Sequence, residues 1–270
     1  LCNTTGSSNV AVGFQAMYLN STGASNIAMG SEALDANTTA SGNTAVGFRS
    51  LTANTTGTNG VAVGCGALKS NTEGGCNVAV GRISLQDNTT GANNVAIGAS
   101  ALQSNTTASD NVAIGKSALT ATLTGCRNVA IGTQALLSNT ADNNVAVGFC
   151  ALKTNSSGAN NTAVGRFSLL LNQTGATNTA VGQNSLHSNT TAADNTAVGA
   201  GSLYTNTTGA CNVAVGRSAL TANTTGGCNT AVGKYAMLAN TTGANNVAVG
   251  ACALDSNTEG NSNVAMGRNS

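Results

Sequence analysis

The sequence has no proline and no tryptophan among its 270 residues, and only 7% of its residues are charged. Without proline, every residue keeps a backbone N–H to donate, which suits continuous sheet ladders. A net charge of +1 gives no basic footprint for nucleic acid and no polybasic patch for a membrane surface, so we expect neither partner. Aromatic residues make up 3% of the chain, which predicts no platform for stacking bases or sugars. No run of 18 apolar residues occurs, so we expect no membrane span.

The stretch Asn-Val-Ala-Val-Gly at residues 246–250 recurs along the whole chain. Its closing glycine occurs sixteen times at a spacing of 17, with a single step of 16 between Gly132 and Gly148. A fixed period over the whole length indicates a repeat architecture, so we expect a single array over residues 1–270 without separate caps or a second domain. Because the chain begins at Leu1 and ends at Ser270, both inside a repeat, we expect a piece of a longer protein or a unit that stacks end to end.

Each repeat has fixed and variable columns, which we number from its glycine as position 0. Position −2 is always Ala, position −1 is Val, Ile or Met, and position −4 is Asn in fifteen of sixteen repeats. Position +4 is Leu or Met in all fifteen repeats that reach it, and position +7 is Asn in fourteen of them. A repeat of 17 residues is too short for a helix plus a strand with two turns, but it fits two short strands and two turns. The fold class is therefore predicted to be all-β: a parallel β-solenoid, or β-roll, of about sixteen 17-residue rungs with two short strands per rung.

The two strands are expected at positions −4 to +1 and +2 to +6, with the core formed by the −1 and +4 columns. Since side chains alternate along a strand, Ala at −2 and Gly at 0 would then share the outer face. Small residues in a strand often mark the close approach of another backbone, so we expect a neighbouring chain against this stripe. The alternative is a thin roll that the Ala and Gly columns line from inside. Stacked Asn side chains are expected to form hydrogen-bonded ladders, and the missing residue is expected to be absorbed in the turn Asn139–Asp142, with the strands in phase on both sides.

The repeat resembles two related groups of proteins. The residues that carry the resemblance are the run Asn178-Thr179-Ala180-Val181-Gly182, then Ser185-Leu186 and Asn189-Thr190-Thr191. The head domains of trimeric autotransporter adhesins repeat a similar Asn-x-Val-Ala-Ile-Gly motif in a left-handed parallel β-roll, and some bacteriophage tail fibres carry longer repeats like these. The resemblance implies an extracellular homotrimeric fibre that meets a cell-surface receptor or glycan. The rung is longer than is usual in adhesin heads, and the eight cysteines are unusual in such fibres.

No catalytic, cofactor or metal site is predicted. Nucleophilic catalysis needs a base beside a nucleophile, but the only histidine, His187, stands in a variable column. The nine acidic residues are scattered, no Cys and His spacing resembles a zinc site, and no phosphate-binding glycine loop occurs. We therefore expect that the protein is not an enzyme.

The eight cysteines all occupy variable columns, which predicts turn or surface positions and favours an oxidising, extracellular setting. Cys211 and Cys228 are 17 residues apart and share position +12. Equivalent Cα atoms on adjacent rungs lie about 4.8 Å apart, within the range of a disulfide. We predict this bridge, with a stabilisation of about 3 kcal/mol at most.

The +7 column contains twelve Asn-x-Ser/Thr sequons, which would form a glycan ladder in a host that glycosylates; otherwise Asn-Thr-Thr is simply suitable turn chemistry. The candidates are Asn3, Asn20, Asn37, Asn54, Asn88, Asn105, Asn155, Asn172, Asn189, Asn206, Asn223 and Asn240, with Asn160 outside the column.

These features favour a non-enzymatic structural or adhesive extracellular fibre, at the surface of a cell or virion, that provides a rigid elongated scaffold for attachment. The alternative is a self-assembling, N-glycosylated filament stacked head to tail, because Ser270 at +3 and Leu1 at +5 would continue the phase with one residue missing. A minor alternative is an ice-binding solenoid. Its weakness is that the Thr-Thr pairs lie in a turn, whereas ordering water favours Thr-x-Thr along a flat strand.

Overall fold

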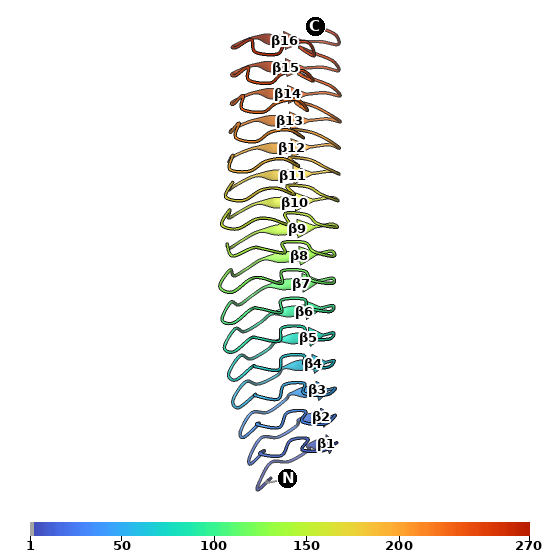
Figure 1. The fold of residues 1–270 in the computed structure, drawn as a ribbon, viewed down its shortest axis with the longest axis vertical. Helices are drawn as coiled ribbons and strands as arrows, with labels where there is room; N and C mark the ends of the chain where they lie inside the picture. Colours follow the sequence, from blue (N-terminus) through green and yellow to red (C-terminus); the bar gives the residue numbers. More distant parts are fainter. Residues whose placement is uncertain (1–2) are drawn as a thin grey trace. The chain divides into compact units, whose positions relative to one another are not determined.

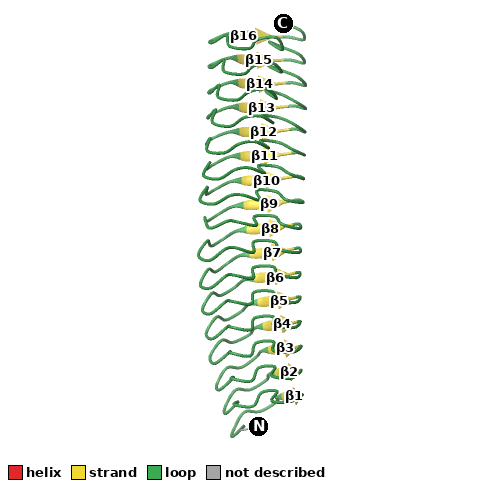
Figure 2. Ribbon diagram, in the orientation of Figure 1, coloured by secondary structure: helices red, strands yellow, loops and turns green. Residues whose placement is uncertain are grey.

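The computed structural model describes residues 3–270 and contains one short strand in every repeat (Figures 1 and 2). The sixteen strands have three residues each: β1 Val10–Val12, β2 Ile27–Met29, β3 Thr44–Val46, β4 Val61–Val63, β5 Val78–Val80, β6 Val95–Ile97, β7 Val112–Ile114, β8 Val129–Ile131, β9 Val145–Val147, β10 Thr162–Val164, β11 Thr179–Val181, β12 Thr196–Val198, β13 Val213–Val215, β14 Thr230–Val232, β15 Val247–Val249 and β16 Val264–Met266. The predicted all-β parallel β-solenoid is confirmed. Within the described residues, no helix is long and apolar enough to cross a membrane.

The chain divides into two compact units, and the single array over residues 1–270 stays a prediction. The first unit, Leu1–Gln134, contains β1 to β8, and the second, Ala135–Ser270, contains β9 to β16. In each unit, every strand pairs in parallel with the strand of the next repeat, and equivalent positions face one another. In the second unit, for example, Thr179 pairs with Thr196 and Ala180 with Ala197. One period of the sequence therefore advances the chain by one strand, with no shift in register.

The second predicted strand, at positions +2 to +6, is wrong, because that segment is a series of turns. The residues at +2 and +4 have positive φ angles, as at Asn184 (57°) and Leu186 (48°). This left-handed conformation is disfavoured for a residue with a side chain. Here it curls the chain so that Leu186 points into the interior, where it is fully buried. Its N–H still donates to Ser202 of the next rung at 3.0 Å, so the turns remain hydrogen-bonded from rung to rung.

The prediction of the core is half right. The +4 column is buried from Met17 to Met237, as expected, but the −1 column faces outward and the −2 alanines are the inner residues of the strand. Ala96 is fully buried, whereas Ile97 is 39% exposed. The alternative of a thin roll lined by alanine is therefore correct. Because the opposite wall already supplies a leucine at every rung, the interior has room for a methyl group beside it but not for a second branched column.

Only glycine fits at position 0, because of its backbone conformation and because of the close approach of the next rung. Gly182 has a φ of +130°, and a Cβ built there would lie 2.7 Å from the carbonyl carbon and oxygen of Gly199. Both features exclude a side chain, since φ is in the region that L-residues avoid and the clash is with backbone.

The turn that lacks one residue closes more tightly and leaves the columns in phase, as predicted. Asn139 Nδ2 donates to the carbonyl of Ala141 at 2.7 Å, two residues on. In complete turns the same atom reaches three residues on, as Asn155 reaches Gly158. After this turn Ala146 and Leu152 are fully buried, so the core columns are maintained.

Candidate functional site

The outer face of the sheet is an uncharged apolar surface formed by the −3 and −1 columns. Position −3 is Val, Ile or Thr, and position −1 is Val, Ile or Met in every repeat. Away from the chain ends these side chains are half-buried to exposed, as at Ile97 and Ile114, which are 39% and 36% exposed. We call these two columns the outer sheet face. It is the surface on which a neighbouring chain was expected, but its side chains are branched and not the Ala and Gly first assigned there.

The turn that follows each strand gathers most of the cations. Positions +1 and +2 carry seven of the ten basic residues: Arg49, Arg82, Lys116, Arg166, Arg217, Lys234 and Arg268. The same two columns contain only one acidic residue, Glu32. Backbone hydrogen bonds hold them in register, since the N–H at +2 donates to the carbonyl at +1 of the preceding rung; Tyr235 N–H, for example, donates to Arg217 O at 3.1 Å. We call these columns the cationic turn.

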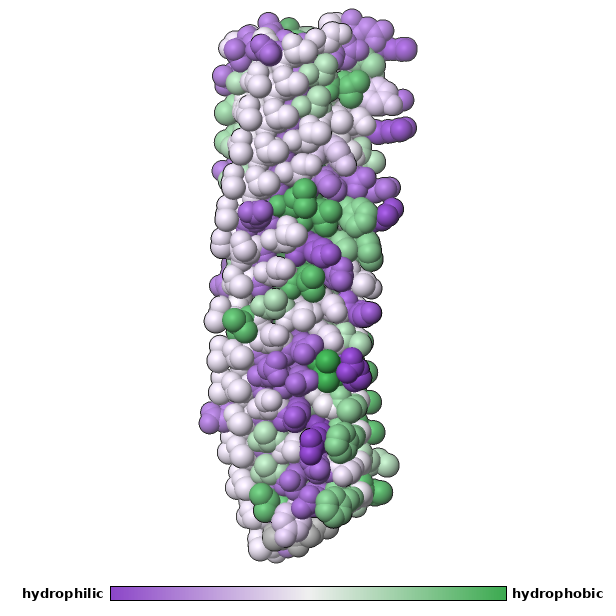
Figure 3. All heavy atoms as spheres, in the orientation of Figure 1, coloured by the Kyte–Doolittle hydropathy of each residue, from purple (hydrophilic) through white to green (hydrophobic). Residues whose placement is uncertain are grey.

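All four phenylalanines and one tyrosine also lie in the cationic turn. In the second unit, the ring of Phe149 packs edge-on against that of Phe167, with centroids 5.4 Å apart, and the Arg166 guanidinium lies 4.4 Å from the Phe167 centroid. The Lys234 ammonium lies 4.7 Å from the centroid of the Tyr235 ring. On the face of the molecule that Figure 3 shows, patches of hydrophobic and of hydrophilic residues lie among residues of intermediate hydropathy.

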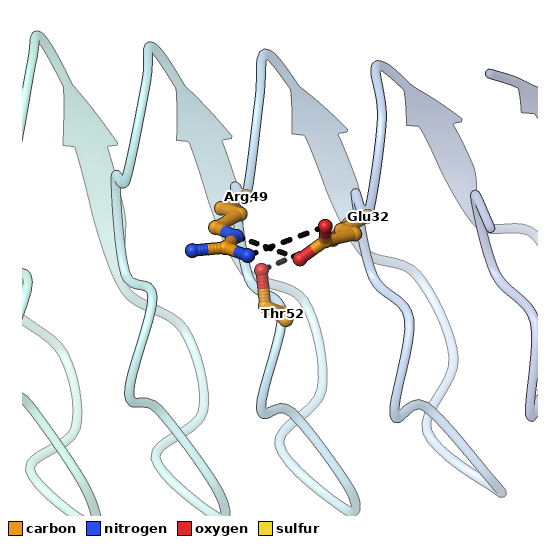
Figure 4. A network of polar contacts seen from close by, with 3 residues as sticks. All are labelled: Glu32, Arg49 and Thr52. Carbon is orange, nitrogen blue, oxygen red and sulfur yellow. Dashed lines mark hydrogen bonds and ion pairs between the residues drawn. The ribbon is translucent and has the colours of Figure 1, made fainter. Parts of the chain in front are cut away.

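The single acid of the cationic turn forms a local network (Figure 4). Glu32 accepts two hydrogen bonds from Arg49 on the next rung, from Nε at 2.6 Å and from an Nη at 3.3 Å. Thr52 Oγ1 donates to the backbone carbonyl of Glu32 at 3.0 Å. In the first unit Arg49 is thereby neutralised, which leaves Arg82 and Lys116 as its other cations in this turn.

The two asparagine columns form buried ladders, as expected. At −4, Asn178 N–H donates to Asn161 Oδ1 at 2.9 Å, and Asn178 Nδ2 donates to Ala192 O at 2.8 Å. At +7, wherever the preceding rung also has Asn, Nδ2 donates to the Oδ1 of that rung and to a turn carbonyl, as Asn172 does to Asn155 and Gly175.

This burial argues against a glycan ladder on the folded chain. Of the twelve column sequons, eleven asparagines are fully buried and only Asn3 is exposed. N-glycosylation would replace one of the two Nδ2 hydrogens that the ladder uses and would place a sugar in a closed interior. The exposed candidates are Asn3 and Asn160, the latter outside the column.

The threonine pairs are engaged in the same turn. The first threonine of a pair donates its hydroxyl to the backbone of the next rung, as Thr55 does to Thr72 O at 3.0 Å. A hydroxyl held in this way serves the turn rather than an ordered water layer, which argues against the ice-binding alternative.

Cys211 and Cys228 are free thiols that lie side by side on adjacent rungs, as the predicted bridge requires, and both are exposed. Desolvation, followed by the proximity of Cys228 and of Asp194, raises the pKa of the Cys211 thiol. The disulfide itself stays a prediction. Cys2 lies outside the described residues.

The remaining titratable groups are dispersed. His187 stacks on Tyr204 with ring centroids 4.8 Å apart, and desolvation lowers its pKa. Within residues 3–270, no group of three or more His, Cys, Asp and Glu side chains is arranged to hold a metal ion, and no pocket is found.

Sequence reasoning missed the outer sheet face and the cationic turn. Counting charges column by column would have revealed the cationic turn. The net charge of +1 hides it, because the cations at +1 and +2 are offset by acids that lie mostly in other columns. No family model matches this chain, and no curated protein matches it.

Proposed function

We propose that this chain is a non-enzymatic structural and adhesive element outside the cell, a rigid scaffold that associates with copies of itself through the outer sheet face. The observation that carries the proposal is the uncharged Val, Ile, Thr and Met surface along both units. Monomeric proteins rarely leave apolar patches larger than a few hundred Å² in water. The eight strands of a unit, stacked about 4.8 Å apart, give the face a length of about 40 Å. Its two columns are about 7 Å apart and, with their side chains, cover a width of about 10 Å, so the area is about 400 Å² per unit. An exposed apolar patch of this size on one unit is of the kind that often marks an interaction surface.

A second copy is the partner that fits this surface best. Its own outer face repeats at the same rung spacing, so branched side chains of one copy would fit between those of the other along the whole contact. Sheets pack face to face in this way at about 10 Å. The absence of charge from both columns means that no ion is desolvated in the contact.

The backbone supports the role of a scaffold. Within each unit, hydrogen bonds join successive rungs at the strand and at both turns, and the two asparagine ladders add further inter-rung hydrogen bonds. Four exposed thiols, Cys65, Cys76, Cys211 and Cys228, favour the oxidising setting of an extracellular protein, where they would pair.

Sedimentation equilibrium tests the association. We expect the wild-type chain to form a defined oligomer, and the double variant Ile97→Lys/Ile114→Lys to be a folded monomer, since like charges on adjacent rungs repel. The control is Gln86→Lys/Gln103→Lys, which adds the same charge to neighbouring rungs at the +5 column. A monomeric wild-type protein at micromolar concentration, or an outer-face variant that associates as the control does, would refute the proposal.

A further inference from the structure

The second unit presents a row of exposed cations that no acid in the same columns balances. Arg166, Arg217, Lys234 and Arg268 are all exposed at position +1. Successive members are three, one and two rungs apart, which corresponds to about 14, 5 and 10 Å at the spacing of a parallel sheet. Because their backbone is hydrogen-bonded from rung to rung, the separations are set by the fold rather than by flexible loops.

Aromatic rings stand beside the cations at two places in this row. The first place holds Phe149, Phe167 and Arg166, and the second holds Tyr235 and Lys234 with Arg217 one rung before. Phe149 is 47% exposed, so part of its ring is open to a ligand. Arg166 lies over the face of Phe167 and Lys234 over the face of Tyr235, so the ring most open to a ligand is that of Phe149, which packs against Phe167. An exposed aromatic ring next to a cation suits a ligand with an apolar face and a negative charge on its rim. A pyranose ring with a carboxylate has this chemistry.

The two rungs between these places are uncharged at positions +1 and +2, and the acid of the first of them, Asp194, lies at +12. Their +1 and +2 residues are Gln183 with Asn184 and Ala200 with Gly201, which are amides or small residues. A chain that lies across them meets hydrogen-bonding groups and no anion. The adjoining +5 column has Lys153 near Arg166 and Asp255 one rung before Arg268. Arg166, Arg217 and Lys234 are therefore the cations best placed to bind an anion.

We propose that this part of the cationic turn, from Phe149 to Tyr235, binds a linear acidic polysaccharide that runs along the stack of rungs. The inference rests on the proposed attachment function and names its ligand class. The spacing favours a polysaccharide over a nucleic acid. A nucleic-acid strand carries a charge about every 3.4 Å, whereas the cationic places here are about 14 Å apart. A polysaccharide with one carboxylate per disaccharide has its negative charges further apart than a nucleic acid does, which suits the wide spacing of these cations.

Fluorescence anisotropy with a labelled hyaluronan decasaccharide tests the proposal, with neutral dextran and oligo(dT) as comparison ligands. We expect the full chain to bind the decasaccharide with an affinity that falls as salt rises. The variant Arg217→Gln/Lys234→Gln is expected to bind about tenfold more weakly, and Phe149→Ala to weaken binding as well. These substitutions suit the fold, because other repeats already have Gln183 and Ala200 at +1. The matched control, Lys69→Gln/Arg127→Gln, removes the same charge from other columns and is expected to bind as the wild type does.

Three results would overturn the proposal: tighter binding of oligo(dT) than of the decasaccharide, equal binding of dextran, or equal loss of binding in the control. Circular dichroism of each variant shows whether the fold is kept. Sedimentation separates this inference from the proposed scaffold. A wild type that binds the decasaccharide as a monomer refutes self-association and supports the ligand, whereas an oligomer that does not bind it refutes the ligand alone.

Discussion

The substitution Asn172→Ala tests whether the interior asparagine ladder stabilises the solenoid. Asn172 is fully buried in the +7 column of the second unit. Its Nδ2 donates to Asn155 Oδ1 at 2.8 Å and to Gly175 O at 2.9 Å, and its Oδ1 accepts from Asn189 Nδ2 at 2.8 Å. Alanine removes all three hydrogen bonds at a site that solvent does not reach.

The expected loss follows from what each former partner retains. Gly175 O still accepts from Asn161 Nδ2 at 2.9 Å, and Asn189 Nδ2 still donates to Ala192 O at 3.0 Å. Asn155 Oδ1 loses the hydrogen bond from the ladder, and one N–H of Asn189 loses its acceptor. Two buried polar groups without partners cost about 1–3 kcal/mol each, so we expect the free energy of unfolding to fall by about 3 kcal/mol.

Denaturant unfolding followed by far-ultraviolet circular dichroism measures the loss, and hydrogen exchange of β10 and β11 amides locates it. The control is Gln173→Ala, an exposed residue of the same turn without a positive φ, for which a change below about 0.5 kcal/mol is expected. Asn172→Thr should fall between the two, since Thr122 occupies the +7 column naturally. If Asn172→Ala and Gln173→Ala lower the free energy of unfolding equally, the asparagine ladder does not stabilise the interior.

Three further predictions use single columns. Gly182→Ala should prevent folding of the second unit or lower its thermal midpoint far more than Gly227→Ala does. The +11 column of Gly227 already contains Ala210 and Ala244, Gly227 has no positive φ, and a Cβ there would lie 3.1 Å from its nearest neighbour, Ala210 O. Equal midpoints would contradict the conformational argument. Oxidised protein should yield a Cys211–Cys228 peptide pair in mapping without reduction, and two free thiols in fully oxidised material would exclude the bridge. Asp35→Asn should raise the free energy of unfolding at pH 7 by about 1 kcal/mol or less. Desolvation and then the charge of Glu32 raise the pKa of Asp35 above 3.8, so its carboxylate is destabilised in the folded state. In addition, one carboxylate oxygen of Asp35 is buried without a hydrogen-bond partner among the described residues. A raised pKa means that the folded state holds its proton longer, so stability falls as pH rises through the folded value, and the gain from the variant should vanish below about pH 3.8; a gain that persists in acid would contradict the assignment.

The sequence predicts the rung but not which side of the strand is inside. A Val-Ala-Val strand can bury its branched residues or its alanine with equal regularity, and periodicity alone does not distinguish the two. The choice depends on the opposite wall, where Leu186 and its equivalents reach inward from a left-handed backbone. No local preference predicts that conformation for leucine, because it is intrinsically disfavoured. It is adopted because it buries a large side chain at every rung and keeps the inter-rung hydrogen bonds.

The same geometry determines where function can reside. The −4, −2, 0, +4 and +7 columns are committed to the interior or to rung contacts, so a charge or a ring there would leave a buried ion or break a ladder. Charged and aromatic residues and cysteines are therefore confined to the columns that the fold leaves free, and +1 and +2 received seven of the ten cations and five of the seven aromatic residues. The totals of 7% charged and 3% aromatic residues predicted no basic footprint and no stacking platform, because they average over columns that cannot hold such residues. In a solenoid the relevant density is the density per column, and by that measure the cationic turn is rich in the groups that recognise an anionic sugar.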